Sequence, residues 1–320
     1  MKTRASFIEP MLLLGVRTLP DDAAHWVLEL KMDGYRAVAF NARRTIHLRS
    51  RHDKDFSARY PAIARALAPL PSDTVVDGEV VALDAEGRPS FSILQNYGPS
   101  AGPVVYFLFD VMVLAGRNLR AEPLSERRRL LEEKVLPRLD EPVRCSPTFD
   151  APLADLTAAV RAQRLEGLVA KRRDSRYEPG LRSGAWQKMR INRGQEFVIG
   201  GFTQGTSSFD ALIIGYYTAD GLVYAARTRN GFTPASRQAL FRRLRALEIA
   251  TCPFVNLPET GSGRWGQGLT AAKMKDCRWL TPVLVAQFEF VEWTPEGHLR
   301  HSHFVSLRED ISPRDVRREA

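Results

Sequence analysis

The chain has 320 residues, of which 44% are hydrophobic and 26% charged, so it is long enough for two domains with separate cores. Its formal net charge of +9 suits a polyanionic partner, although a basic surface without such a role fits equally well. No segment is long enough to span a membrane, and the apolar run at residues 11–16 is too short for a signal core. We therefore expect a cytoplasmic protein that makes no membrane contact.

The three cysteines, Cys145, Cys252 and Cys277, lie far apart and form no paired spacing. Any disulfide between two of them would leave the third cysteine unpaired. This pattern predicts reduced structural thiols and argues against a zinc module.

The first part of the chain predicts short strands that alternate with helices. Apolar and polar residues alternate at 45–50, as in a half-buried strand, and a continuous apolar run at 103–116 indicates an interior strand. Gly78 is expected to break the segment 74–94 into two strands, which a turn at residues 86–87 follows. Helices are predicted at 60–71, 125–134 and 153–164, and two further strands at 167–173 and 185–191.

After residue 193 the pattern changes to closely spaced strands separated by glycines and polar turns. One helix is predicted at 233–247, with Thr233 as its cap and Pro234 at its first position. Several strands with one helix in about 125 residues are typical of a small Greek-key barrel of the OB type, which often binds nucleic acid. The strands are predicted at 196–203, 211–218, 222–228, 283–293 and 298–307.

Lys31 ends an apolar run and is followed by Asp33, Gly34 and Arg36. A buried lysine is costly unless it is paired or deprotonated, and a deprotonated lysine is a nucleophile. Gly34 would let the backbone approach a ligand, and Arg36 would offer a planar fork to phosphate or hydroxyl oxygens. A surface lysine before an ordinary Asp-Gly turn explains the same residues about as well.

The motif K-x-D-G-x-R at 31–36 is followed, in order, by five more motifs. They read SR at 50–51, DGE at 77–79, YFLFD at 106–110, EGLVAK at 166–171 and WQKMR at 186–190. The series resembles the nucleotidyltransferase motifs of ATP-dependent DNA ligases, RNA ligases and mRNA capping enzymes. The segments 7–12 and 279–310 resemble bacterial end-joining ligases, free-standing or as modules of larger enzymes.

The resemblance implies an α+β fold. An adenylation (nucleotidyltransferase, ATP-grasp-like ligase) domain of antiparallel sheets and flanking helices would occupy residues 1–193. A β-barrel OB-fold domain would occupy residues 194–320. The expected function is ATP-dependent sealing of nicks or breaks in duplex DNA, through a lysyl-AMP intermediate and an adenylated DNA 5′-phosphate.

The resemblance also implies roles for the nucleotide-binding residues. Lys31 would attack the α-phosphate of ATP and expel pyrophosphate. Glu29 would accept a hydrogen bond from the adenine amino group, and Phe109 would stack on adenine, although a core aromatic explains the latter from pattern alone. Arg36 and Glu79 would hold the ribose and order the nucleotide.

A second group of residues would handle phosphate and metal. Arg51 would grip the 5′-phosphate of the nick, and Glu166, together with Glu79, would hold Mg²⁺ or Mn²⁺. Lys188 and Arg190 alternate along one strand, so both would face the α-phosphate, although an exposed basic strand face fits the same pattern. These two cations and Arg36 are expected to discourage protonation of Lys31.

Two positions depart from the family pattern. Arg190 stands where the family usually has lysine, which keeps the charge and changes the geometry. Arg308 and Asp310 match the C-terminal R-x-D-K motif that closes over ATP, but Ile311 replaces its lysine. Two alternative functions therefore remain. One is a catalytically idle paralogue that binds nicks or DNA ends as a scaffold. The other, with less support, is a capping enzyme or RNA ligase. The expected partners of a monomeric ligase are broken duplex DNA and, in trans, end-joining proteins.

Overall fold

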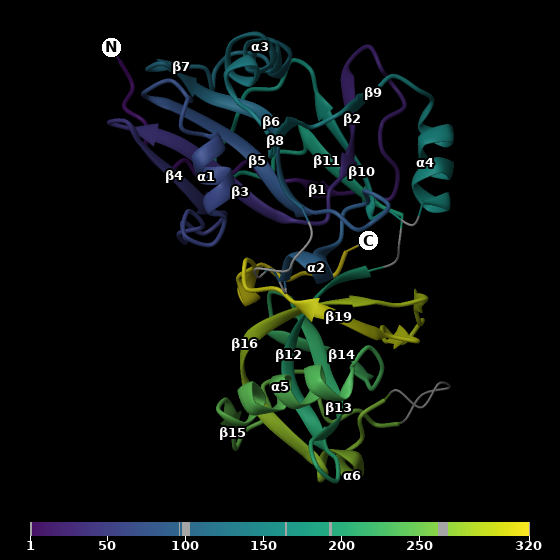
Figure 1. Ribbon diagram of the computed structural model, residues 1–320. Coiled ribbons are helices and arrows are strands. Elements are labelled where there is room, and N and C mark those ends of the chain that lie inside the picture. The colour runs from purple at the N-terminus through teal and green to yellow at the C-terminus, as the bar shows by residue number, and fades with distance from the viewer. Residues whose placement is uncertain are drawn as a thin grey trace. The chain divides into compact units, whose positions relative to one another are not determined.

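The computed structural model describes residues 2–95, 97, 103–163, 165–191, 194–261 and 268–319. The chain divides into two compact units, residues 1–192 and 193–319 (Figure 1). No described helix is long and apolar enough to cross a membrane. Each unit is built on antiparallel pairing, which hairpin connections allow without long crossovers.

The first sheet of unit 1 has five strands in the order β1-β11-β10-β2-β9. Strand β10 is central and pairs antiparallel with both β2 and β11. Its apolar side packs in a core with the helix α4, and the two strands predicted at 167–173 and 185–191 are confirmed. The elements are β1 (Leu14–Gly15), β2 (Trp26–Lys31), β9 (Thr148–Phe149), α4 (Leu153–Ala162), β10 (Gly167–Arg172) and β11 (Trp186–Arg190).

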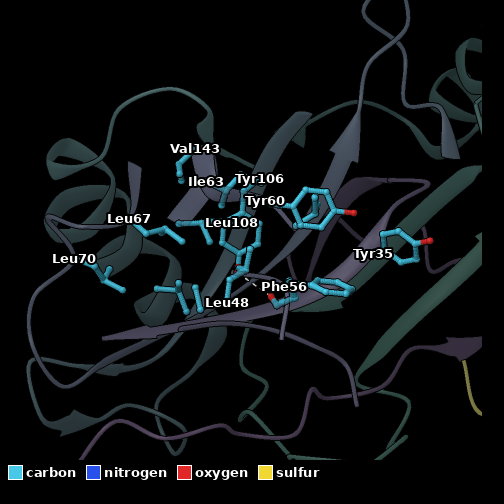
Figure 2. Packing of buried hydrophobic residues seen from close by; sticks show 14 of the residues in the cluster. Tyr35, Leu48, Phe56, Tyr60, Ile63, Leu67, Leu70, Tyr106, Leu108 and Val143 are labelled. Carbon is cyan, nitrogen blue, oxygen red and sulfur yellow. Dashed lines mark hydrogen bonds between the residues drawn. The ribbon is translucent and has the colours of Figure 1, made fainter. Parts of the chain in front are cut away.

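The second sheet of unit 1 has the order β4-β3-β5-β6-β7, with β8 parallel to β6. Figure 2 shows the buried side chains on one side of it, where Tyr106 also donates its hydroxyl to the carbonyl of Ala37 at 2.8 Å. The elements are β3 (Tyr35–Ala42), β4 (Thr45–Ser50), α1 (Pro61–Ala66), β5 (Thr74–Ala82), α2 (Phe91–Gln95), β6 (Val104–Leu114), β7 (Arg117–Asn118), α3 (Leu124–Leu130), η1 (Leu131–Val135), η2 (Leu136–Arg138) and β8 (Val143–Cys145).

The predicted break at Gly78 is wrong, because β5 runs through it without interruption. A Cβ at Gly78 would lie 2.5 Å from the carbonyl oxygen of Phe107, so the glycine permits close strand approach instead of ending the strand. The pairing with β6 shifts register between Asp77 and Gly78, which is the local cost of that approach. The turn predicted at residues 86–87 is confirmed, with Gly87 at φ +77°.

Unit 2 is a six-stranded sheet in the order β14-β13-β12-β16-β15, with β19 also paired to β16. The amide of Phe304 in β19 donates to the carbonyl of Asn230, just after β14, at 3.0 Å, which closes the sheet into a barrel. The elements are β12 (Gly194–Gln204), β13 (Phe209–Tyr217), β14 (Leu222–Thr228), α5 (Pro234–Arg245), β15 (Glu248–Ile249), α6 (Ala271–Met274), β16 (Cys277–Glu289), β17 (Glu292–Trp293), β18 (Leu299–Arg300), β19 (His303–Leu307) and η3 (Pro313–Asp315).

Two predictions for unit 2 can be compared directly. Thr233 caps α5 by accepting from the amide of Ser236, and Pro234 takes the first helical position, as predicted. The single strand predicted at 298–307 is wrong, because His301 adopts φ +53° and separates β18 from β19.

A buried ion pair joins α3 to β6. The side chains of Arg127 and Asp110 are fully buried, and two guanidinium nitrogens donate to the two carboxylate oxygens at 2.8 Å each. A third nitrogen of Arg127 donates to the carbonyls of Glu122 and Ser175 at 2.7 and 2.8 Å. The arginine therefore connects the helix, the sheet and the segment after β10.

Replacing Arg127 with leucine is expected to lower the free energy of unfolding by about 3–5 kcal/mol, because Asp110 would remain buried without its partner. Urea unfolding followed by circular dichroism measures this. Arg129→Leu, on the exposed side of the same helix, removes only solvent-screened pairs and should have a much smaller effect. Equal effects of the two substitutions would contradict the role given to the buried pair.

Candidate active site

The register of the first sheet gathers charged side chains on one face. Gly167 of β10 lies between Lys31 of β2 and Arg190 of β11. Side chains two residues apart on a strand share a face, so the neighbouring polar positions join the same surface. The face carries five polar side chains: Glu29, Lys31, Lys171, Lys188 and Arg190.

The second sheet supplies the opposite wall of a pocket. Arg36 of β3, Glu79 of β5 and Phe107 of β6 occupy one row across that sheet. Because this row belongs to a different sheet from Lys31, the pocket lies between the two sheets of unit 1. Its lining residues are Leu13, Glu29, Leu30, Lys31, Met32, Arg36, Glu79, Phe107, Phe109, Ser146, Val169 and Lys171.

Lys31 is held by a carboxylate. Its Nζ lies 2.8 Å from each carboxylate oxygen of Glu166, the residue just before β10. Arg190 approaches the same carboxylate at 3.0 Å. A carboxylate therefore lies next to Lys31, between it and one of the cations expected there. That Lys188, Arg190 and Arg36 discourage protonation of Lys31 stays a prediction.

Glu29 is buried, with its side chain 3% exposed, and has two cationic partners. Arg128 of α3 donates to one carboxylate oxygen at 2.7 Å, and Lys171 donates to the other at 2.8 Å. Ser146 lies 3.4 Å from the second oxygen. Desolvation holds the pKa of Lys171 below its ordinary value, and the charge of Glu29 opposes that shift only in part. This network keeps a carboxylate acceptor fixed in the pocket.

Arg36 is anchored on the pocket wall by Asp77. Two guanidinium nitrogens of Arg36 donate to Asp77 at 2.6 Å each, and the carboxylate also accepts from the hydroxyl of Tyr177 at 2.5 Å. Desolvation, the largest single influence, lowers the pKa of Arg36, but the charge and hydrogen bonds of Asp77 together with the charges of Tyr177 and Glu79 outweigh it and raise that pKa. Burial, followed by the charge of Asp77, raises the pKa of Tyr177 well above its ordinary value. Arg36 is therefore a permanent cation.

Phe109 is surrounded by cations. The guanidinium carbon of Arg36 lies 4.5 Å from the ring centroid, and Nζ of Lys171 lies 3.8 Å from it. Trp186 meets the ring edge-on, with the centroids 6.2 Å apart. The ring is 6% exposed and lines the pocket together with Phe107. The pocket therefore offers two aromatic rings on which a base can stack, whereas the sequence indicated Phe109 alone.

Sequence reasoning also missed Lys171, Arg128, Asp77, Tyr177 and Ser146. Lys171 and Asp77 stand inside quoted motifs, and strand alternation from Glu79 could have indicated Asp77. The other three lie outside every motif, and no spacing signal connects them to the pocket. Arg128, Tyr177 and Ser146 reach the pocket only through long-range packing.

Five predicted site residues do not line this pocket: Arg51, Glu166, Lys188, Arg190 and Arg308. Glu166 contacts Lys31, and Lys188 and Arg190 lie on the same sheet face as Lys31. Arg51 lies in the turn after β4, and Arg308 belongs to unit 2. Arg308 donates to both oxygens of Asp310, at 2.9 and 2.8 Å. Ile311, next to that pair, packs against the apolar core of unit 2.

The described residues contain no group of three or more His, Cys, Asp or Glu side chains arranged to hold a metal ion. Glu79 lines the pocket, and Glu166 contacts Lys31. One or two carboxylates with substrate phosphates are a usual ligand set for Mg²⁺, so the residues present fit a metal that arrives with a nucleotide.

Gly167 is required by the close approach of β10 and β11. A Cβ at this position would lie 2.1 Å from the carbonyl oxygen of Met189. Gly167→Ala should separate the strands and lower the free energy of unfolding by about 1–3 kcal/mol, which urea unfolding would reveal. Gly15→Ala is the control in the same sheet, since its Cβ would meet only Lys188 at 3.9 Å. A stability loss from Gly15→Ala as large as that from Gly167→Ala would argue against the steric explanation.

Comparison with known proteins identifies the family. The family model described as "ATP dependent DNA ligase domain" matches residues 16–190, and that described as "ATP dependent DNA ligase C terminal region" matches residues 205–311. A solved structure, "mycobacterial DNA ligase D complexed with ATP and MES", has a TM-score of 0.69 and 34% identity, with 98% of each chain covered. The predicted α+β fold with antiparallel sheets and an OB barrel is thereby confirmed.

Two curated relatives resemble the chain over most of its length. The "Multifunctional non-homologous end joining DNA repair protein LigD" of Mycobacterium tuberculosis is 36% identical over 98% of this chain, which spans 40% of that protein. "DNA ligase C2" of Mycolicibacterium smegmatis is 30% identical over 94% of each protein. The resemblance found in the motifs is therefore confirmed. This chain belongs to the family of ATP-dependent DNA ligases.

Proposed function

We propose that the chain is an ATP-dependent DNA ligase that seals nicks or breaks in duplex DNA through a lysyl-AMP intermediate. The single observation that carries this is the placement of Lys31 at the pocket, in contact with Glu166 and beside Glu29 and Arg36. Relatives that this chain resembles include one named as an end-joining repair protein and one solved with ATP. The same substrates are proposed here on that basis.

The first step forms a bond between Nζ of Lys31 and the α-phosphorus of ATP. Lys31 needs an unshared electron pair to attack, so its ammonium must first lose a proton. The carboxylate of Glu166, 2.8 Å away, is placed to accept it. The bond from the α-phosphorus to the bridging oxygen then breaks, and pyrophosphate leaves with those electrons.

The choice of ATP would follow from Glu29. A carboxylate accepts hydrogen bonds and cannot donate them, so it can pair with the amino group of adenine. Guanine presents a carbonyl oxygen at that position, and two acceptors face to face repel each other. Phe109 or Phe107 would stack on the base, and Arg36 and Glu79 would order the ribose and phosphates. This argument favours a DNA ligase over a GTP-dependent capping enzyme.

Cations would neutralise the phosphates during both transfers. Lys188 and Arg190 share a face of β11, next to Lys31. Mg²⁺ or Mn²⁺, held by Glu79 or Glu166 together with the phosphates, would withdraw negative charge from them. After AMP passes to the 5′-phosphate of a nick, gripped by Arg51, the 3′-hydroxyl would displace AMP and close the strand.

The two parts of the chain would divide the work. Residues 1–193 would form the adenylation domain, and residues 194–320 the OB domain, which would bring Arg308 to the nucleotide and bind DNA. A monomer working in the cytoplasm, with any end-joining proteins acting in trans, fits this arrangement.

Lys31→Ala should abolish covalent labelling by [α-³²P]ATP and all ATP-dependent sealing, because no other lysine occupies the motif. The label is measured on denaturing gels after incubation with Mg²⁺. Lys134→Ala, which removes an exposed lysine of η1, is the control and should keep the label. A labelled Lys31→Ala protein would assign the nucleophile to another residue, and labelling by GTP instead of ATP would indicate a capping enzyme.

Ile311→Lys should accelerate lysyl-AMP formation while leaving sealing of a preadenylated nick nearly unchanged. A cation that meets the departing pyrophosphate is worth on the order of 2–4 kcal/mol, so a gain of about tenfold would be measurable. Arg314, which stacks on Tyr217 with 4.4 Å between guanidinium and ring, and Arg317 are the alternative cations. If Arg314 already serves, Arg314→Ala slows adenylation and Ile311→Lys changes little.

The preadenylated nick separates the ligase from an idle scaffold. A ligase seals that substrate without ATP, because the last step needs only the 3′-hydroxyl, a metal ion and the pocket. Wild-type protein that binds the preadenylated nick and fails to seal it would favour the scaffold.

A further inference from the structure

A buried arginine of α3 contacts the nucleotide pocket through the residues that line it. Arg128 has 8% of its side chain exposed, and one guanidinium nitrogen donates to Oε1 of Glu29 at 2.7 Å. A second nitrogen donates to the backbone carbonyl of Ser146 at 3.0 Å. Glu29 and Ser146 line the pocket, and Arg128 does not. Any influence of Arg128 on a bound nucleotide therefore passes through these partners.

The helix that carries Arg128 is anchored by a different residue. Arg127 donates to both carboxylate oxygens of Asp110 in β6 at 2.8 Å, which fixes α3 against its sheet. Neighbouring residues of a helix point in different directions, so Arg128 can turn toward β2 while Arg127 holds the helix. The nitrogens of a guanidinium form a rigid planar fork. Two acceptors, on Glu29 and Ser146, therefore define the position and the plane of the Arg128 side chain.

The two carboxylate oxygens of Glu29 differ in their remaining capacity to accept. Oε2 accepts from Nζ of Lys171 at 2.8 Å and faces the hydroxyl of Ser146 at 3.4 Å. Oε1 accepts from Arg128 alone among the side chains that the structure describes. Each oxygen of a carboxylate accepts about two hydrogen bonds. The oxygen that Arg128 holds is therefore the one that keeps an acceptor direction for a nucleobase.

Holding this oxygen in advance matters for binding. A glutamate side chain rotates about several bonds, and a group that is ordered only when the ligand arrives weakens the observed affinity. Arg128 has one other carboxylate partner, Glu132, but that contact is longer, at 3.6 Å, and the side chain of Glu132 is 53% exposed. Solvent screens such a pair, so the stronger contact of Arg128 is the one with Glu29.

We propose that Arg128 is a positioning residue that sets nucleobase selectivity, because it holds Oε1 of Glu29 where the 6-amino group of adenine binds. Lys171 holds the other oxygen and leaves Oε1 unrestrained if the arginine is lost. Removing Arg128 should therefore weaken the contact with the amino group and spare the contacts with ribose and phosphates. The inference rests on the proposed function, in which Glu29 accepts from adenine.

The test compares ATP with purine riboside triphosphate, which lacks the 6-amino group and is otherwise the same molecule. Covalent labelling of the full chain with Mg²⁺ is followed in single turnovers by intact-protein mass spectrometry, over a range of nucleotide concentrations. Arg128→Met removes the guanidinium and keeps an unbranched, adaptable side chain. Arg129→Met removes the same group from an exposed position of α3 and is the matched control. Thermal unfolding shows that each variant is folded.

Arg128→Met should raise the half-saturating concentration of ATP about tenfold, the usual effect of weakening one hydrogen bond to a carboxylate. The maximal labelling rate should stay within about twofold of the wild type, because the lost contact is made before and during the reaction alike. Purine riboside triphosphate should bind almost as it does to the wild type, so the preference for ATP falls. Arg129→Met and Glu132→Gln should both keep the wild-type preference.

A conservative variant tests the geometry. Arg128→Lys should lose less of the preference for ATP, because an ammonium can still donate to Oε1 of Glu29 but cannot also fix the plane through Ser146. This variant carries the test if Arg128→Met does not fold. Equal weakening of both nucleotides by the folded variant would overturn the inference, since a general distortion of the pocket would then explain the loss.

The remaining outcomes separate this inference from the proposed function. Wild-type protein that becomes labelled by neither nucleotide would refute the proposed function. Wild-type protein that uses both nucleotides equally well would refute the adenine contact of Glu29, and the inference with it. A preference for ATP that Glu29→Ala abolishes and Arg128→Met retains would overturn this inference alone.

Discussion

The pocket between the two sheets of unit 1 depends on the pairing of charges that are removed from water. An isolated buried ion is too costly to persist, so each one must find an opposite charge or several hydrogen bonds. Glu29 has Arg128 and Lys171, and Arg36 has Asp77. Each of these pairs joins different strands or helices. The site therefore forms only when these elements pack together.

The pairing of buried charges also fixes where charged groups stand in the pocket. The carboxylate of Glu29 accepts from a cation on each oxygen, which fixes the position of an acceptor in the pocket. Lys31 is different, because its partner Glu166 is also approached by Arg190. A carboxylate shared between two cations can release one of them and keep the other. Lys31, the proposed nucleophile, is therefore held in a pair that Arg190 shares.

Unit 2 depends on backbone hydrogen bonds between its strands. Its strands close into a barrel through the contact between Phe304 and Asn230, which leaves few free strand edges. Ile311 contributes to the core of this unit where the family pattern has a lysine, so the apolar packing of the tail has replaced a charged contact.

The sequence by itself determined the family and the faces of the strands, and it predicted the nucleophile. Lys31 could be found because the K-x-D-G-x-R spacing is local, and Lys188 and Arg190 could be placed together because strand alternation is local too. Most helix and strand positions followed from the same short-range rules. The exceptions include Gly78 and His301, where a close approach and a left-handed residue depend on neighbouring strands. The single strand predicted at 283–293 is also wrong, because β16 ends at Glu289 and β17 at Glu292–Trp293 belongs to a separate sheet.

Only the tertiary structure decided which charges meet. Arg128 and Lys171 reach Glu29 from 99 and 142 residues away along the chain, and no spacing rule connects such positions. The contact between Lys31 and Glu166 spans 135 residues, and the motifs did not predict that these two side chains meet. Pattern shows which side of a strand a residue faces. What lies opposite depends on how sheets and helices pack, which is set by the burial of the whole core.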